Sequence, residues 1–144
     1  MSEDLSLVEE VGGRAVLERV HKKFYDKLYE HAWLKHFFAD IYQKVIQDQQ
    51  TDFMVSNRGE DRIHSGKLPK PAHKHMNITD EMFEERDRIL NESILECGVR
   101  PDLAGRWLKI DYACKQSLVK SSLAECEKRF DTDEILDVPK PPNF

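Results

Sequence analysis

The chain has 144 residues, of which 40% are hydrophobic and 34% are charged, and its formal net charge is −5. This is about one domain's length, enough to enclose an apolar core. The acidic balance argues against a nucleic-acid-binding surface, and no apolar run is long enough to cross a bilayer. The start MSEDLSLVEE lacks the apolar core of a signal peptide. The three cysteines form no CxxC pair and fit reduced thiols. We therefore expect a cytoplasmic protein with no membrane contact.

Helical periodicity dominates the first part of the chain, and no alternating pattern is long enough to predict a sheet. After VGG, apolar residues recur at steps of three and four from Val16 to Leu28, which predicts an amphipathic helix. Residues 32–38 indicate a short helical turn. A further apolar line over residues 41–54 predicts a second long helix that stops near NRGED.

An irregular segment separates this first helical pair from the rest of the chain. Two glycines and two prolines fall between residues 59 and 71, which predicts an extended loop. A long loop inside a helical domain often leaves room for a ligand between the helices. A flat aromatic cofactor would fill such a gap, and the loop would present one histidine to a metal at its centre.

The helix after the loop has clear boundaries in the sequence. Thr79 is a good N-cap, and the acidic residues 80–81 suit the positive end of a helix. An apolar stripe continues over residues 83–97 to Gly98, a plausible C-terminal stop. We therefore predict a helix from residue 80 to about residue 97.

A last long helix is expected after Pro101, with Asp102 as its N-cap and an apolar line over residues 103–121. The sequence thus predicts an all-α fold with two long helices on each side of the loop. We expect a single domain over residues 1–130. The proline-rich residues 131–144 predict an extended or disordered tail.

The stretch KPAHKHMNIT holds two histidines, His73 and His75, just before the predicted N-cap. A histidine in a polar segment is more often a solvated surface residue than a metal ligand. The stretch by itself does not decide between these two interpretations.

The order of motifs resembles the truncated haemoglobins, small globins in which two helices pack over two, and most closely their first group. The motifs are VGG, FYDKLYEH, LKHFFAD, QQTDFM, AHKHMNIT and DEMF, and the resemblance runs from about residue 11 to about residue 120. It implies a two-over-two helical sandwich with a long glycine- and proline-bearing loop before the proximal histidine.

The resemblance also implies roles for individual residues. His73 falls at the position of the proximal ligand of the haem iron, with His75 as the less favoured alternative. Tyr25 matches the distal tyrosine whose hydroxyl donates a hydrogen bond to the bound gas. Gln50 matches a distal amide, whereas Gln49 is expected to face solvent. The competing interpretation of Tyr25 is ordinary core packing, and that of Gln50 is solvation.

Apolar residues around these positions are expected to form the wall of the haem pocket. The resemblance implies contacts to the haem from Phe38, Ile46, Phe53, Ile78 and Phe83. Ordinary core packing is the competing interpretation, and it is compatible with haem contact.

Four features depart from the family pattern. The usual double glycine is replaced by RGED, and His64 stands where an aromatic residue is usual. His21 lies one helical turn before Tyr25, where the family tends to be apolar. Arg86 replaces a usually apolar residue beside the haem; we expect it to point to water, with a haem propionate as the alternative partner. Neither His21 nor His64 matches a family ligand position.

The function implied by the resemblance is a non-covalent haem b protein, since the chain has no CxxCH motif. It would bind O2, NO or CO at a five-coordinate iron, for oxygen binding or transport, as a monomer or weak homodimer. With a reductase it would have NO dioxygenase or peroxidase-like activity. Two alternatives stay open: a non-catalytic globin-fold sensor or binding module, and a bis-histidine haem electron-transfer protein.

Overall fold

A computed structural model of the chain describes residues 7–39, 41–57, 76–112, 119–120, 126 and 135–142. The described residues form α-helices and one 3-10 helix, and they contain no strand longer than an isolated bridge. The elements are α1 (Leu7–Val11), α2 (Arg14–Glu30), η1 (Leu34–Phe38), α3 (Gln43–Asn57), α5 (Asp80–Glu96) and α6 (Pro101–Tyr112). The glycine- and proline-bearing loop lies outside the described residues.

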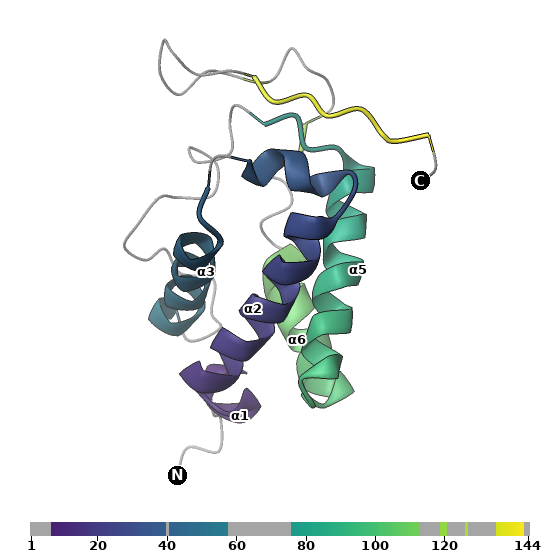
Figure 1. The fold of residues 1–144 in the computed structure, drawn as a ribbon. Helices are drawn as coiled ribbons and strands as arrows, with labels where there is room; N and C mark the ends of the chain where they lie inside the picture. The colour runs from purple at the N-terminus through teal and green to yellow at the C-terminus, as the bar shows by residue number, and fades with distance from the viewer. Residues whose placement is uncertain are drawn as a thin grey trace.

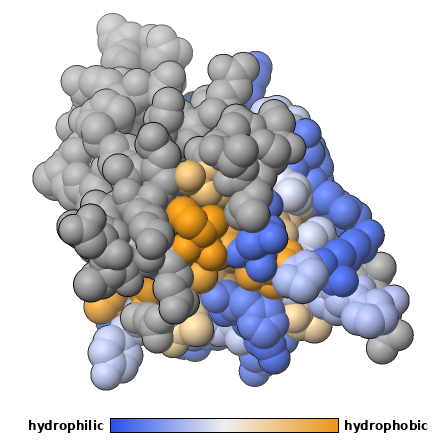
Figure 2. Space-filling view, turned by 90° about the horizontal axis from the view of Figure 1, so that it is seen from above, coloured by the Kyte–Doolittle hydropathy of each residue, from blue (hydrophilic) through white to orange (hydrophobic). Residues whose placement is uncertain are grey.

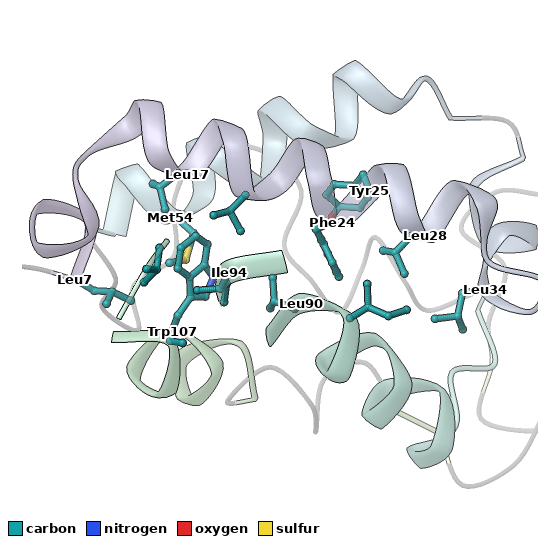
Figure 3. Packing of buried hydrophobic residues seen from close by; sticks show 14 of the residues in the cluster. Leu7, Leu17, Phe24, Tyr25, Leu28, Leu34, Met54, Leu90, Ile94 and Trp107 are labelled. Atoms are coloured by element: carbon teal, nitrogen blue, oxygen red, sulfur yellow. The ribbon is translucent and has the colours of Figure 1, made fainter. Parts of the chain in front are cut away.

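The helices pack in two layers, with α2 and α3 over α5 and α6 (Figure 1). The core forms where α2 crosses this pair, because its apolar residues share one face at steps of three and four. Figure 3 shows Phe24 directed from α2 toward α5, and Trp107 reaching from α6 toward Met54 of α3. The predicted all-α, two-over-two arrangement is therefore confirmed.

Helix α1 was not expected from the sequence, which placed the start of the fold near residue 11. Leu7 and Val8 are buried, and α1 packs against α6 and α2. The chain turns between α1 and α2 through Gly12 and Gly13, whose φ angles are 118° and 85°. Such positive angles favour glycine, which explains the VGG motif at this corner.

His31 is the C-cap of α2 and lies three residues before the first residue of η1. Its Nδ1 atom accepts hydrogen bonds from the backbone N–H groups of Trp33 (3.1 Å) and Leu34 (3.0 Å). Its Nε2 atom lies 2.8 Å from a carboxylate oxygen of Glu85 in α5. One side chain therefore bonds to two backbone N–H groups at the start of η1 and joins this end of α2 to α5.

Helix α5 has the boundaries that its sequence predicts. The Thr79 side chain accepts a hydrogen bond from the Met82 N–H (3.2 Å), so Thr79 is the N-cap. At the other end, Gly98 has a φ of 85°, and its N–H donates to the Leu95 carbonyl (3.0 Å). The Val99 N–H donates to the Ile94 carbonyl (3.4 Å), which completes a Schellman turn.

Helix α6 differs from its prediction at both ends. It begins at Pro101, so Asp102 lies in its first turn and pairs with Arg100 instead of standing at the N-cap. A helix extending to residue 121 is wrong for residues 119–120. Val119 forms a parallel bridge with Ile78, and the Lys120 N–H donates to the Ile78 carbonyl (2.8 Å).

Residues 135–142 cross the end of the molecule next to the start of α5 (Figure 1). Leu136 pairs in parallel with Met76, and its carbonyl accepts the Asn77 N–H (2.8 Å). The Trp33 indole N–H donates to the Val138 carbonyl (3.2 Å). These bonds hold residues 135–142 against Trp33 and against the short segment before α5. We call residues 135–142 the C-terminal strap.

Candidate functional site

Tyr25 lies on the inner face of α2, where its side chain is only 4% exposed. Its ring is 4.9 Å from the Phe24 ring and meets the Phe38 ring edge-on at 6.0 Å, centroid to centroid. Burial raises the pKa of the Tyr25 phenol to about 12, so the hydroxyl keeps its proton at neutral pH. None of the described residues forms a hydrogen bond with this hydroxyl. A phenol held by aromatic packing, with its hydroxyl unbonded, can donate a hydrogen bond to a ligand.

The Phe38 ring that faces Tyr25 is itself held in place. It stacks on the Tyr29 ring at a centroid distance of 5.1 Å, and the Tyr29 hydroxyl donates to the Ile41 carbonyl (2.7 Å). Through these contacts α2 and η1 fix two aromatic rings at the edge of the core. The orientation of Tyr25 therefore depends on packing from two elements.

The second predicted distal residue, Gln50, lies on α3. Gln50 is half-buried and the neighbouring Gln49 is exposed. Thr51, the next residue, is 1% exposed, and its hydroxyl oxygen lies 2.7 Å from the Nδ1 atom of His21. His21 therefore has a partner on α3. The role of Gln50 toward a ligand stays a prediction.

The five predicted wall residues border the core, but most of them are incompletely covered. Phe83 is buried, whereas the other four pack against the core and are half-buried: Phe38, Ile46, Phe53 and Ile78. Figure 2 shows apolar side chains gathered in the middle of one face of the molecule, with polar ones beside them. Of these residues Phe38 contacts the Tyr25 ring. A half-covered aromatic ring beside a phenol fits a flat apolar cofactor with a polar ligand on one face.

The predicted proximal side of the site falls on histidines of the loop before α5. His73, His75 and His64 lie outside the described residues. Met76, the first residue described after the loop, is buried and pairs with the C-terminal strap. The assignment of His73 as the iron ligand therefore stays a prediction.

A cluster of charges lies inside the fold where the sequence did not predict one. The Nη1 atom of Arg86 is 2.5 Å from Asp111 of α6 and 3.1 Å from its neighbour Asp87. Its guanidinium carbon lies 5.2 Å from the Phe24 ring centroid and 5.6 Å from that of Phe83. The expectation that Arg86 points to water is wrong, because its side chain is only 23% exposed and bonds to two carboxylates.

The two carboxylates respond differently to this arrangement. Burial and a hydrogen bond with Asp111 raise the pKa of Asp87. Burial opposes ionisation of Asp111 too, but the adjacent Arg86 charge outweighs it and holds the Asp111 pKa below its ordinary value. Two carboxylates that share one guanidinium repel each other, so one of them retains a proton more readily. Sequence periodicity could not reveal this pairing, because Asp111 is 25 positions away from Arg86.

The described helices, packed two over two with Tyr25 and Phe38 in ring contact, define a globin-like fold. The family model for bacterial-like globins matches residues 6–111, and the chain belongs to this family. A group 1 truncated haemoglobin from Tetrahymena thermophila is 27% identical over 110 residues, which cover 76% of this chain and 91% of that protein. The resemblance to group 1 truncated haemoglobins is thus confirmed.

Two solved structures support the same conclusion. The truncated haemoglobin of Tetrahymena pyriformis in its Fe(III) form is 25% identical with a TM-score of 0.73, covering 81% of this chain and 99% of that one. The 2/2 haemoglobin of a Synechococcus species, in the cyanomet state with covalently attached haem, is 26% identical with a TM-score of 0.65. That match covers 73% of this chain and 89% of the other. In the described part of the chain, no helix is long and apolar enough to span a membrane.

Proposed function

We propose that this chain binds haem b non-covalently and uses it to take up a diatomic gas, O2, NO or CO. The observation that carries the proposal is the Tyr25 side chain, which is 4% exposed and meets the half-covered Phe38 ring edge-on. Its hydroxyl forms no hydrogen bond with a described residue. Globins as a family bind haem and gases, and haem supplies an iron that coordinates the gas. The chain's own residues would then set the strength and selectivity of binding.

Tyr25 acts as the main distal donor in this proposal. Its high pKa keeps it a neutral phenol, which donates a hydrogen bond to a gas ligand that carries partial negative charge. Gln50 reaches the same space from α3 as a second polar group. A hydrogen bond to a charged acceptor contributes about 1.5–3 kcal/mol. Such a contribution favours O2 over CO, because CO develops less negative charge.

His73 is proposed as the proximal ligand, through a neutral imidazole nitrogen. Phe38, Ile46 and Phe53 would cover one face of the haem, and Ile78 and Phe83 the other. Neither His21 nor His64 matches a ligand position of the family. We therefore propose a five-coordinate ferrous state with an open position for the gas.

A second proposal follows from the same distal pair and requires a reductase as a partner. Tyr25 and Gln50 would hold O2 in an orientation in which NO attacks its outer atom. The overall reaction joins NO, O2 and one electron to give nitrate. A separate electron-transfer reductase would supply that electron in each cycle. This activity is tested by nitrate formation in the presence of such a reductase.

The gas-binding proposal is tested by titrating the purified protein with hemin and recording absorption spectra. We expect one hemin per chain, a Soret band, and a five-coordinate high-spin ferrous form that binds CO rapidly. Failure to bind hemin would overturn the proposal in favour of a haem-free globin-fold module. A low-spin, six-coordinate ferrous spectrum would instead indicate a bis-histidine electron-transfer protein.

A further inference from the structure

A buried hydrogen bond joins the two helices that carry the proposed distal residues. The Nδ1 atom of His21 on α2 lies 2.7 Å from the hydroxyl oxygen of Thr51 on α3. Both side chains are 1% exposed, and they are 30 residues apart in the sequence. The bond is therefore a tertiary contact shielded from water, where a hydrogen bond competes least with solvent.

The positions of the two residues relate the bond directly to the gas site. His21 lies one helical turn before Tyr25, on the same face of α2. Thr51 directly follows Gln50 on α3. Any change in the distance between His21 and Thr51 therefore moves the Tyr25 hydroxyl relative to the Gln50 amide.

The choice of histidine at this position requires an explanation, because an aliphatic side chain would pack there without an unpaired nitrogen. The Nε2 atom of His21 is buried and has no hydrogen-bond partner. An unsatisfied buried polar atom destabilises a fold by about 1–3 kcal/mol. Packing alone therefore does not favour a histidine at position 21. The stabilising contact that histidine adds there is the hydrogen bond between its Nδ1 atom and Thr51.

The surroundings of His21 make the bond rigid and keep it in one protonation state. The Trp107 ring of α6 meets the imidazole edge-on at a centroid distance of 5.7 Å. Burial lowers the pKa of His21 to about 3, so the imidazole is neutral throughout the physiological range. The neutral His21 imidazole, in contact with the Trp107 indole, is therefore a hydrogen-bond partner of fixed position for Thr51.

Other polar contacts between α2 and α3 are more open to solvent. Arg14 bonds to Asp52 (2.7 Å) with both side chains exposed, and Gln43 bonds to Asp26 (2.5 Å) at the other end of the pair. Exposed ion pairs contribute little, because water and salt compete with them. Of these three contacts, the one between His21 and Thr51 is the fully buried one.

We propose that His21 and Thr51 are positioning residues that hold Tyr25 and Gln50 at the spacing needed to grip a gas ligand. This inference rests on the proposed function, in which Tyr25 donates to that ligand. Neither residue touches the gas. Their effect reaches it through the separation and register of α2 and α3.

The test compares four variants of the hemin-loaded protein. Thr51→Val removes the hydroxyl and keeps the branched shape, whereas Thr51→Ser keeps the hydroxyl. Ser93→Ala is the matched control: it also removes a buried hydroxyl, one that donates to the Ile89 carbonyl (2.8 Å) within α5. Tyr25→Phe tests the proposed function separately. The measurements are the O2 dissociation rate, the CO stretching frequency and the denaturant unfolding curve.

We expect Thr51→Val to speed O2 release by about threefold or more and to shift the CO stretching frequency. Thr51→Ser should stay close to wild type. Ser93→Ala should lower stability and leave both ligand measurements unchanged.

Two results would overturn the inference while the proposed function stands. One is accelerated O2 release in Tyr25→Phe with no effect of Thr51→Val beyond that of Ser93→Ala. The other is a Thr51→Ser protein that behaves like Thr51→Val. If neither Tyr25→Phe nor Thr51→Val changes O2 release, the inference and the distal role of Tyr25 fail together.

Discussion

Arg86 of α5 and Asp111 of α6 form an ion pair inside the lower helical layer, with 2.5 Å between Nη1 and Oδ2. Both side chains are largely withdrawn from water, and the guanidinium also faces the rings of Phe24 and Phe83. Desolvation makes such a pair expensive to assemble, so its net contribution to stability is small. Removing one partner of the pair destabilises the fold strongly, since the remaining charge then stays buried without its partner.

Asp111→Asn should therefore lower the free energy of unfolding by about 3 kcal/mol, because Arg86 loses its shortest carboxylate contact. Asp87→Asn should cost less than about 1 kcal/mol, because Arg86 keeps Asp111 and the amide replaces a carboxyl that keeps its proton in the folded chain at pH 7. Denaturant unfolding at pH 7 measures both. Equal losses of unfolding free energy in the two variants would show that Asp87 stabilises the buried Arg86 charge as much as Asp111 does.

The same cluster predicts a pH dependence of stability. The folded-state pKa of Asp87 is raised, so the folded chain holds a proton that the unfolded chain releases. The stability that this bound proton contributes is present below pH 3.8, the ordinary pKa of an aspartate, and is lost as pH rises toward about 8. Wild type should accordingly lose stability relative to Asp87→Asn across this window, which unfolding curves at several pH values will reveal.

His21 predicts a dependence of the opposite sign. Its folded-state pKa is lowered from 6.5 to about 3, so the unfolded chain binds the extra proton. The stability linked to the neutral imidazole is present above pH 6.5 and is lost as pH falls toward 3. Relative to His21→Leu, wild type should lose up to about 1.4 kcal/mol per pH unit in that window. Parallel curves for the two proteins would mean that His21 titrates normally.

Tyr25→Phe removes one hydroxyl and little volume, so hemin binding should survive. Losing a hydrogen bond worth about 1.5–3 kcal/mol should speed O2 dissociation by about tenfold or more. Stopped-flow mixing of the oxygenated protein with an O2 scavenger measures the rate. An unchanged rate would assign Tyr25 to the core and not to the gas.

The C-terminal strap should stabilise the segment that leads into α5. Deleting residues 135–144 removes the Asn77–Leu136 backbone bond and the Trp33–Val138 bond. At about 1 kcal/mol for each hydrogen bond, stability should fall by about 2 kcal/mol, and hemin should transfer faster to an acceptor globin. Asp137→Ala, which removes only the exposed bond to the Asn77 side chain, is the control. Equal hemin loss in the full and shortened chains would contradict a role for the strap.

Local signals in the sequence predicted the elements that local chemistry determines. Thr79, the acids after it and Gly98 delimit α5 because a cap and a positive φ act within a few residues. The apolar repeat of α2 likewise predicted its buried face. The motif order gave the family, since several weak motifs at consistent separations are jointly specific.

The rest depended on contacts between distant parts of the chain. Helix α1 is too short for a periodic signal, and it is held by packing on α6. The burial of Arg86 and His21 follows from Asp111 and Thr51, which no local pattern connects to them. Both residues depart from the family pattern, and this departure is the signal in the sequence that their environments differ from those usual in the family.

The central claim, a gas-binding haem held by His73, is tested most directly by absorption spectra of hemin-loaded wild type, His73→Ala and His75→Ala. The two histidines share one short segment, so each variant controls for the other. We predict that wild type and His75→Ala show the same ferric Soret band and a five-coordinate ferrous form that binds CO. His73→Ala should lose hemin or show a severely shifted spectrum. An intact spectrum in His73→Ala together with its loss in His75→Ala would contradict the assignment.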